Sequence, residues 1–229
     1  MKKVFLLFSV CLLSISASRG LYAQQGQKLT VSEILGERKE IYFDDDKSGD
    51  FPRGFQSGLT GKGEPASWTV RKIERAPSAD NVVVQTKPDE TDYHFPLLIL
   101  EGASYKNASV FVKFRAEGGK IDQAGGLVFR YKDNNNYYVL RANALENNVR
   151  LYVVANGNRT QIGGKNTKVT QKEWHLLKVI YTGNKIQCFY ENTKVFEVTD
   201  TTFDNGSVGL WTKSDSSTYF DDLVIQEIK

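Results

Sequence analysis

The chain has 229 residues and a formal charge of +3, from 30 lysine and arginine residues against 27 aspartate and glutamate residues. Residues 1–23 carry three of the basic residues and no acid, so the rest of the chain is formally neutral. A neutral chain has no net field that would draw it to nucleic acid or to acidic lipid, so we expect neither as a partner. The remaining length of about 206 residues fits one all-β domain.

The first 23 residues are predicted to be a signal peptide. Lys2 and Lys3 precede an uncharged apolar run over residues 4–17, and the small residue Ala23 stands before a cleavage point at Gln24. No later stretch has the ~18 uncharged apolar residues that a membrane span requires. We therefore expect a protein that is secreted, periplasmic or on the cell surface after cleavage.

Residues 24–40 are polar and predict an N-terminal linker or a short helix. Thr30 and Glu33 have the spacing of a capping box ahead of Ile34 and Leu35. The following segment, 48–66, is rich in glycine and proline and nearly free of aliphatic residues, so we expect a long surface loop there.

From residue 41 to the end, short runs of valine, isoleucine, tyrosine, phenylalanine and leucine alternate with turn residues, and no long amphipathic helix is indicated. This spacing predicts a two-sheet antiparallel β-sandwich over residues 41–229. The expected strands are 41–44, 68–73, 81–86, 96–101, 108–116, 125–131, 137–143, 149–155, 159–162, 174–182, 185–191, 194–199, 206–212 and 218–227.

Residues 125–157 form the most informative block, because three predicted strands are joined there by two asparagine-rich turns. Strict alternation directs an apolar set to the core, namely Leu127, Phe129, Tyr138, Leu140, Leu151 and Val153. The opposite, polar face then carries Arg130, Tyr137, Arg141, Asn143, Arg150 and Tyr152. Tyrosine rings stack on sugar faces and arginine forks bind hydroxyls or carboxylates, so this face is a candidate carbohydrate site. An ordinary solvated sheet with cross-strand pairs is the alternative.

Tryptophan, histidine and cysteine add few candidates. Trp211 is predicted either to extend the site as an aromatic platform or to pack in the core, and Trp68 and Trp174 are predicted to be core residues. His175 is expected to be structural, whereas His94 is expected in a loop as an exposed residue, a base or a metal ligand. Cys188 alone remains after cleavage, so no disulfide is expected and a buried thiol is predicted.

The C-terminal third contains the runs Trp174-His175-Leu176-Leu177, Thr182-Gly183-Asn184-Lys185 and Phe220-Asp221-Asp222-Leu223 in that order. This order resembles the laminin-G-like and concanavalin A-like lectin/glucanase sandwiches. The block FRYKDNNNYYVLRANALENNVRLY resembles the 3-keto-disaccharide hydrolase-like family, often labelled family 16 glycoside hydrolase. The resemblance covers residues 43–228 and implies a jelly-roll sandwich of the concanavalin A-like type that engages carbohydrate.

The acidic residues do not decide whether the chain is an enzyme. Family 16 chemistry uses two carboxyl groups on one strand, in a Glu-x-Asp-x-x-Glu pattern that is absent here. Acids near predicted strand ends, which could still meet in space, are Glu101, Asp122, Glu146 and Asp215. Three functions remain: a glycan-binding module, a glycoside hydrolase or lyase acting on 3-keto or related disaccharides as the resemblance implies, and a laminin-G-like protein-interaction domain.

The acids at the two ends of the domain suggest one metal site. Asp44 lies on the first predicted strand and Asp222 on the last, and terminal strands of sandwiches usually pair. Oxygen ligands brought together in this way suit Ca²⁺, so Asp44 and Asp222 are predicted to bind a structural calcium ion. Solvated turn acids are the alternative.

Overall fold

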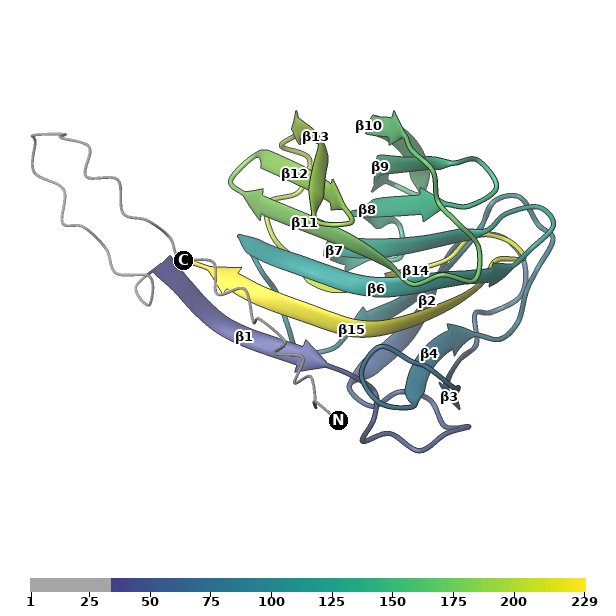
Figure 1. Cartoon of the computed structure of the whole chain (residues 1–229). Coiled ribbons are helices and arrows are strands. Elements are labelled where there is room, and N and C mark those ends of the chain that lie inside the picture. The colour runs from purple at the N-terminus through teal and green to yellow at the C-terminus, as the bar shows by residue number, and fades with distance from the viewer. Residues whose placement is uncertain (1–33) are drawn as a thin grey trace, which may run out of the picture.

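The computed structural model describes residues 34–229, so the predicted signal peptide and the capping-box residues lie outside the described part. This part is built almost entirely of β-strands (Figure 1). No helix within it is long and apolar enough to cross a membrane. The strands are β1 (Leu35–Ile41), β2 (Phe55–Gly61), β3 (Trp68–Lys72), β4 (Asn81–Gln85), β5 (His94–Leu100), β6 (Ala108–Gly118), β7 (Ala124–Asp133), β8 (Asn136–Asn143), β9 (Asn148–Ala155), β10 (Asn158–Asn166), β11 (His175–Thr182), β12 (Lys185–Tyr190), β13 (Thr193–Thr199), β14 (Ser207–Trp211) and β15 (Ser217–Ile228).

The strands form two antiparallel sheets packed face to face (Figure 1). Sheet A has the order β13-β12-β11-β6-β15-β4-β3, with β1 also paired to β15. Sheet B has the order β10-β9-β8-β7-β14-β5-β2. Strands far apart in the sequence are neighbours in both sheets, as β6 and β15 are in sheet A and β7 and β14 in sheet B. The predicted two-sheet antiparallel sandwich is therefore confirmed.

The main core lies between the sheets and is supplied by alternate residues of each strand. Along β6, Val110, Val112 and Phe114 are fully buried while the residues between them are half-buried. In sheet B, Phe129 stacks on Tyr138 of the neighbouring strand, with ring centroids 5.2 Å apart, and also faces Tyr181 of sheet A. Each fully buried large apolar side chain contributes about 1.5–3 kcal/mol, so this layer is the principal source of stability. Cys188 is buried in the same core, as predicted.

Two segments near the N-terminus differ from the prediction. Residues 35–40, expected in a linker or helix, form β1 together with Ile41, the first residue of the expected strand 41–44, and β1 pairs with β15 from Leu35↔Ile228 to Ile41↔Leu223. The expected loop 48–66 contains β2, which pairs with β5 throughout. The sequence of β2 contains glycine and serine and few aliphatic residues, so it does not predict a strand. The strand forms at the edge of the sheet through backbone pairing.

Two aromatic residues also lie elsewhere than expected. His94 is not in a loop: it begins β5 and is fully buried, with Nε2 2.9 Å from the carbonyl oxygen of Glu64. Trp174 is half-buried, not in the core. Its ring lies beside the guanidinium of Arg115, with 5.2 Å from that carbon to the ring centroid.

The predicted calcium ligands have protein partners. The Asp44 carboxylate accepts hydrogen bonds from the Ser78 hydroxyl and the Asn81 amide, whereas Asp222 pairs with Lys113 at 2.7 Å. Asp222 has a left-handed φ of 51° beside a bulge in β15. Ser78 links Asp44 to Asp221, not to Asp222. Among residues 34–229 there is no group of three or more acidic, histidine or cysteine side chains arranged to hold a metal ion.

Candidate functional site

The outer face of sheet B, which points away from the main core, is strongly concave. Its apolar residues form a second buried cluster drawn from sheet B alone. Arg159 on the edge strand β10 reaches Phe95 on β5, with 4.5 Å from the guanidinium carbon to the ring centroid, although four strands lie between β10 and β5. The sheet therefore curls around this face and encloses part of it.

Aromatic side chains line the bottom of this concave face. Phe95 stacks on Trp211 with ring centroids 5.3 Å apart, and the Tyr137 hydroxyl contacts the Thr60 hydroxyl at 2.8 Å. Trp211 is fully buried because β7 offers a glycine beneath it: a Cβ on Gly126 would lie 3.1 Å from the indole ring. Arg159 covers these rings from the open side.

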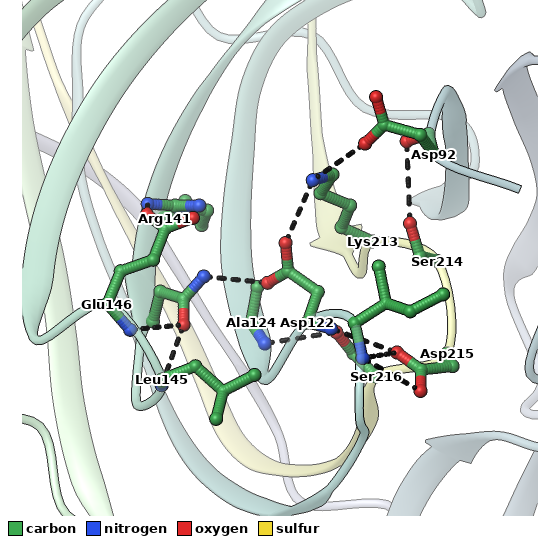
Figure 2. Close-up of polar contacts among 12 residues, drawn as sticks. Asp92, Asp122, Ala124, Arg141, Leu145, Glu146, Lys213, Ser214, Asp215 and Ser216 are labelled. Atoms are coloured by element: carbon green, nitrogen blue, oxygen red, sulfur yellow. Dashed lines mark hydrogen bonds and ion pairs between the residues drawn. The ribbon is translucent and has the colours of Figure 1, made fainter. Parts of the chain in front are cut away.

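A group of charged and amide side chains lies beside the aromatic residues of this face, and we call it the polar cluster; Figure 2 labels Asp122, Arg141, Glu146 and Lys213 of it. Its members are Asp122, Arg141, Asn143, Glu146, Asn148 and Lys213. Arg141 projects from β8 and donates from Nη2 to Glu146 Oε2 at 2.7 Å and to Asn148 Oδ1 at 2.5 Å. Only 1% of Arg141 is exposed, whereas 48% of the Glu146 side chain is. The buried guanidinium is thus linked to an exposed carboxylate.

A second ion pair completes the cluster. Lys213 lies between two carboxylates, 3.0 Å from Asp122 Oδ2 and 3.1 Å from Asp92 Oδ1, as Figure 2 shows. Asn143 joins the two ion pairs: its Nδ2 donates to Asp122 Oδ1 at 2.7 Å, and its Oδ1 accepts from the backbone amide of Glu146 at 3.1 Å. The buried members of the cluster are therefore held in place by mutual hydrogen bonds before any ligand arrives.

The two carboxyl groups of the cluster have pKa values shifted in opposite directions. Burial raises the pKa of Asp122, and the nearby Lys213 only partly offsets this. Burial also opposes ionisation of Glu146, but hydrogen bonds from Arg141 and Asn148 outweigh it and lower its pKa to about 2. The same contact with Asp122 raises the pKa of Lys213 against the effect of burial. Glu146 is hence an ionised acceptor at neutral pH.

Most residues predicted for the site lie on this face. Three of them, Arg141, Arg150 and Trp211, share one cross-strand row with Gly126, and Tyr152 lies beneath Arg141 at 5.7 Å from the guanidinium carbon to the ring centroid. Tyr137 and Asn143 are on the same face, although both are fully buried. The structure thus brings together Tyr137, Arg141, Asn143, Arg150, Tyr152 and Trp211.

Arg130 is the exception. It has a left-handed φ of 49° within a bulge of β7, so its side chain turns into the molecule and lies over the ring of Tyr181. Its guanidinium donates to the carbonyl oxygens of Phe203, Lys106 and Gly183. The expectation that Arg130 shares the face of Val128 is therefore wrong, because the bulge breaks the alternation.

Sequence reasoning did not connect several residues of this face. The sequence predicted that Asp122 and Glu146 could meet other acids in space but named no partner for either, and Lys213 was not among the predicted site residues. Two of these residues could have been placed on this face by alternation. Asp122 stands two residues before Ala124, and Lys213 stands two residues after Trp211, and both Ala124 and Trp211 face outward. Of the other two acids, Asp215 adjoins the cluster and accepts backbone hydrogen bonds from residues 120–122, whereas Glu101 lies apart in a surface depression beside Tyr131.

The sequence matches no family model and no curated protein. Several solved structures share the fold. The carbohydrate-binding module CBM66 from Bacillus subtilis superposes with a TM-score of 0.56 at 19% identity, over 68% of this chain and 92% of that one. Domain 4 of AbnA, a GH43 extracellular arabinanase from Geobacillus stearothermophilus solved with arabinotriose, gives 0.57 at 15% identity, over 86% and 94%. The carbohydrate recognition domain of Emp47p gives 0.55 at 16% identity, over 86% and 98%.

These similarities define the class of fold. The protein has the galectin-like and concanavalin A-like β-sandwich fold that carbohydrate-binding modules and lectin domains also have. The predicted fold class is confirmed. Because the sequence identities are below 20%, these similarities show the fold only, since one fold can support unrelated functions.

Proposed function

We propose that this protein is a glycan-binding β-sandwich whose site is the polar cluster together with Tyr152. The observation that carries the proposal is the Arg141–Glu146 pair, in which a buried arginine orients a half-exposed carboxylate at the rim of a concave sheet face. Sugar hydroxyls both donate and accept hydrogen bonds. A fixed pair of one cation and one anion can therefore bind them. Because both side chains are already held in place, binding costs little conformational entropy.

The cluster assigns a role to each side chain. Glu146 and Asp92 are the more exposed carboxylates and would accept from hydroxyls, while Arg141 and Lys213 hold them in position. The half-buried ring of Tyr152, over which Arg141 and Arg159 lie, would contact the sugar with its exposed part. Trp211 is fully covered, so it would support the floor and not stack on the ligand. The printed names of the CBM66, AbnA and Emp47p domains support a carbohydrate as the ligand class.

A hydrolase or lyase of the 3-keto-disaccharide hydrolase-like type is the second candidate. Two carboxyl groups with oppositely shifted pKa values, as Asp122 and Glu146 have, are a feature of acid–base pairs. Both oxygens of Asp122 are, however, already bonded, to Lys213 and to Asn143. This favours binding over proton transfer. Product analysis of bound oligosaccharides decides between the two, since a binder returns its ligand uncleaved.

The proposed setting is outside the cytoplasm, after removal of residues 1–23. Lys2, Lys3 and the apolar run that follows them support export. N-terminal sequencing of protein from the periplasm or medium should begin at Gln24. A soluble cytoplasmic product that retains Met1 would contradict this assignment.

A glycan array followed by titration calorimetry on the hits tests the site. Arg141→Ala should weaken binding by about ten- to a hundredfold, the value of one charge-assisted hydrogen bond of roughly 1.5–3 kcal/mol. Arg71→Ala is the matched control, because Arg71 lies over Tyr219, 5.9 Å from its ring centroid, on the outer face of the other sheet. Equal affinities of the folded Arg141→Ala variant and the wild type for every ligand would exclude the polar cluster as the site.

A further inference from the structure

Basic residues are segregated along one edge of sheet B. Residues 147–172 contain five lysine or arginine residues and no acid, although the chain after residue 23 is formally neutral. Four of the five are placed on or beside β9 and β10, the last strands of sheet B. We call these four residues the basic edge: Arg150, Arg159, Lys165 and Lys168.

The basic edge is continuous with the polar cluster. Arg150 is the direct cross-strand neighbour of Arg141, so both residues lie on the concave face. Lys165 pairs with Val149, a residue of the main core, so its side chain leaves the edge strand β10 on the inner side of the sheet. The segment after β10 stays close, because the Thr167 amide donates to the Asn147 carbonyl oxygen at 3.0 Å, which holds Lys168 beside the turn between β8 and β9. A ligand in the polar cluster would therefore extend along these cations.

The cations of the basic edge are not neutralised by the protein. Within residues 34–229, none of the four forms a salt bridge, whereas Arg141 and Lys213 of the polar cluster both do. Arg141 and Arg150 face each other directly, an arrangement of like charges that destabilises a sheet unless it is compensated. Glu146 compensates Arg141 alone. Arg150 donates only to the neutral oxygens of Asn166 and Val149.

Arg159 shows the same lack of an acidic partner at the aromatic end. Its guanidinium carbon lies 4.5 Å from the ring centroids of both Phe95 and Tyr152, and its buried Nη1 has no hydrogen-bond partner among the described residues. Among the described residues the charge of Arg159 thus lies against aromatic rings and not against an acid. Carboxylate and sulfate groups are the acceptors whose geometry an arginine fork matches.

We infer that the glycan bound by this protein is anionic, with carboxylate or sulfate groups on its sugar rings that lie along the basic edge. The inference rests on the proposed glycan-binding function and specifies its ligand. Hydroxyl groups of one sugar would occupy the polar cluster, and the charged groups of neighbouring sugars would meet Arg150 first and then the lysines at the edge of the sheet. Such binding should weaken as salt screens the charges.

The test compares glycans that differ only in charge: polygalacturonate against its methyl ester, and dextran sulfate against dextran. We expect at least one anionic member to bind about tenfold or more tightly than its neutral counterpart at low salt, with the difference shrinking as salt is added. The triple variant Arg150→Gln/Lys165→Gln/Lys168→Gln should lose this preference. The control variant Lys47→Gln/Lys106→Gln/Lys178→Gln removes the same charge elsewhere and should keep it.

The outcomes separate the two proposals. Equal binding of charged and neutral members, or equal losses in both triple variants, overturns the anionic ligand. If neutral binding then still depends on Arg141, the proposed function survives that result. Binding of no glycan at all removes both proposals. Tighter binding to a single-stranded DNA oligonucleotide than to either anionic glycan would assign the basic edge to nucleic acid and overturn the inference.

Discussion

Arg130 and Arg141 lie on neighbouring strands, and each is only 1% exposed, yet their partners are of different kinds. Arg130 is inside the sandwich and donates to three backbone carbonyl oxygens. Arg141 is on the outer concave face and holds Glu146, whose carboxylate reaches solvent. Burial alone therefore does not separate a structural arginine from one that we propose to serve binding. The partners do, because backbone carbonyls fix a fold and an exposed carboxylate can still receive a ligand.

The largest effect is expected from the structural arginine. Arg130→Met should lower the free energy of unfolding by roughly 3–5 kcal/mol, because three carbonyl oxygens lose their donor inside the protein. Urea denaturation measures this, with the exposed Arg38→Met as control. A loss below about 1 kcal/mol would show that water replaces the guanidinium, and the comparison with Arg141 would then fail.

The second ion pair of the polar cluster should respond to pH. Lys213→Met leaves the buried Asp122 without a cation, which should cost about 3 kcal/mol at pH 8. The raised pKa of Asp122 would rise further, so the folded state would bind a proton that the unfolded state lacks, and the loss should shrink towards pH 5.

The double variant Asp122→Asn/Lys213→Met should recover most of that stability. Thermal melting at the two pH values checks both statements. A destabilisation by Lys213→Met that is independent of pH would mean that its cause is lost packing and not an unpaired carboxylate.

Asp221 extends the comparison to a buried acid that forms no salt bridge among the described residues. Burial raises its pKa to about 7, although Ser78 and the Asp222 amide donate to it. A raised carboxyl pKa stabilises the fold at low pH, and this contribution is lost as the pH rises through about 7. Asp221→Asn should hence add about 1–3 kcal/mol at pH 8 and almost nothing at pH 4. A gain that is equal at both pH values would refute the shifted pKa.

The smallest effect on stability is expected from the proposed binding residue. Arg141→Ala should cost only about 1–2 kcal/mol, since Glu146 is half-exposed and remains hydrated when its partner is removed. Chemical denaturation beside Arg130→Met gives the comparison directly. A cost as large as that of Arg130→Met would make Arg141 a structural residue of the same kind.

Regular strands could be predicted from the sequence, together with the faces of their residues. Alternation along β8 and β9 correctly separated Tyr138 and Leu140 from Tyr137 and Arg141, because neither strand contains a bulge. The face of Arg130 was assigned wrongly because it lies in a bulge, and a bulge depends on the tertiary pairing of its strand.

The polar cluster depends on contacts between distant segments, which the sequence does not reveal. Asp122 and Lys213 are 91 positions apart in the sequence and meet only because β7 and β14 pair. The strand β2 was missed for a related reason: its seven residues contain few aliphatics, and its pairing with β5 is made by the backbone. The sequence pattern was therefore enough to predict the fold class, whereas the residues of the site could be grouped only once the pairing of the strands was known.

The indole N–H signals of the three tryptophans offer the most direct test of the central claim. Trp211 lies on the concave face of sheet B, Trp174 is half-buried beside Arg115, and Trp68 is in the main core. Titration with a bound glycan, followed by proton–nitrogen NMR, should shift the Trp211 indole and the amides of Glu146 and Tyr152 while Trp174 and Trp68 stay unchanged. A shift of Trp174 with Trp211 unchanged would move the site to the other sheet and contradict the account.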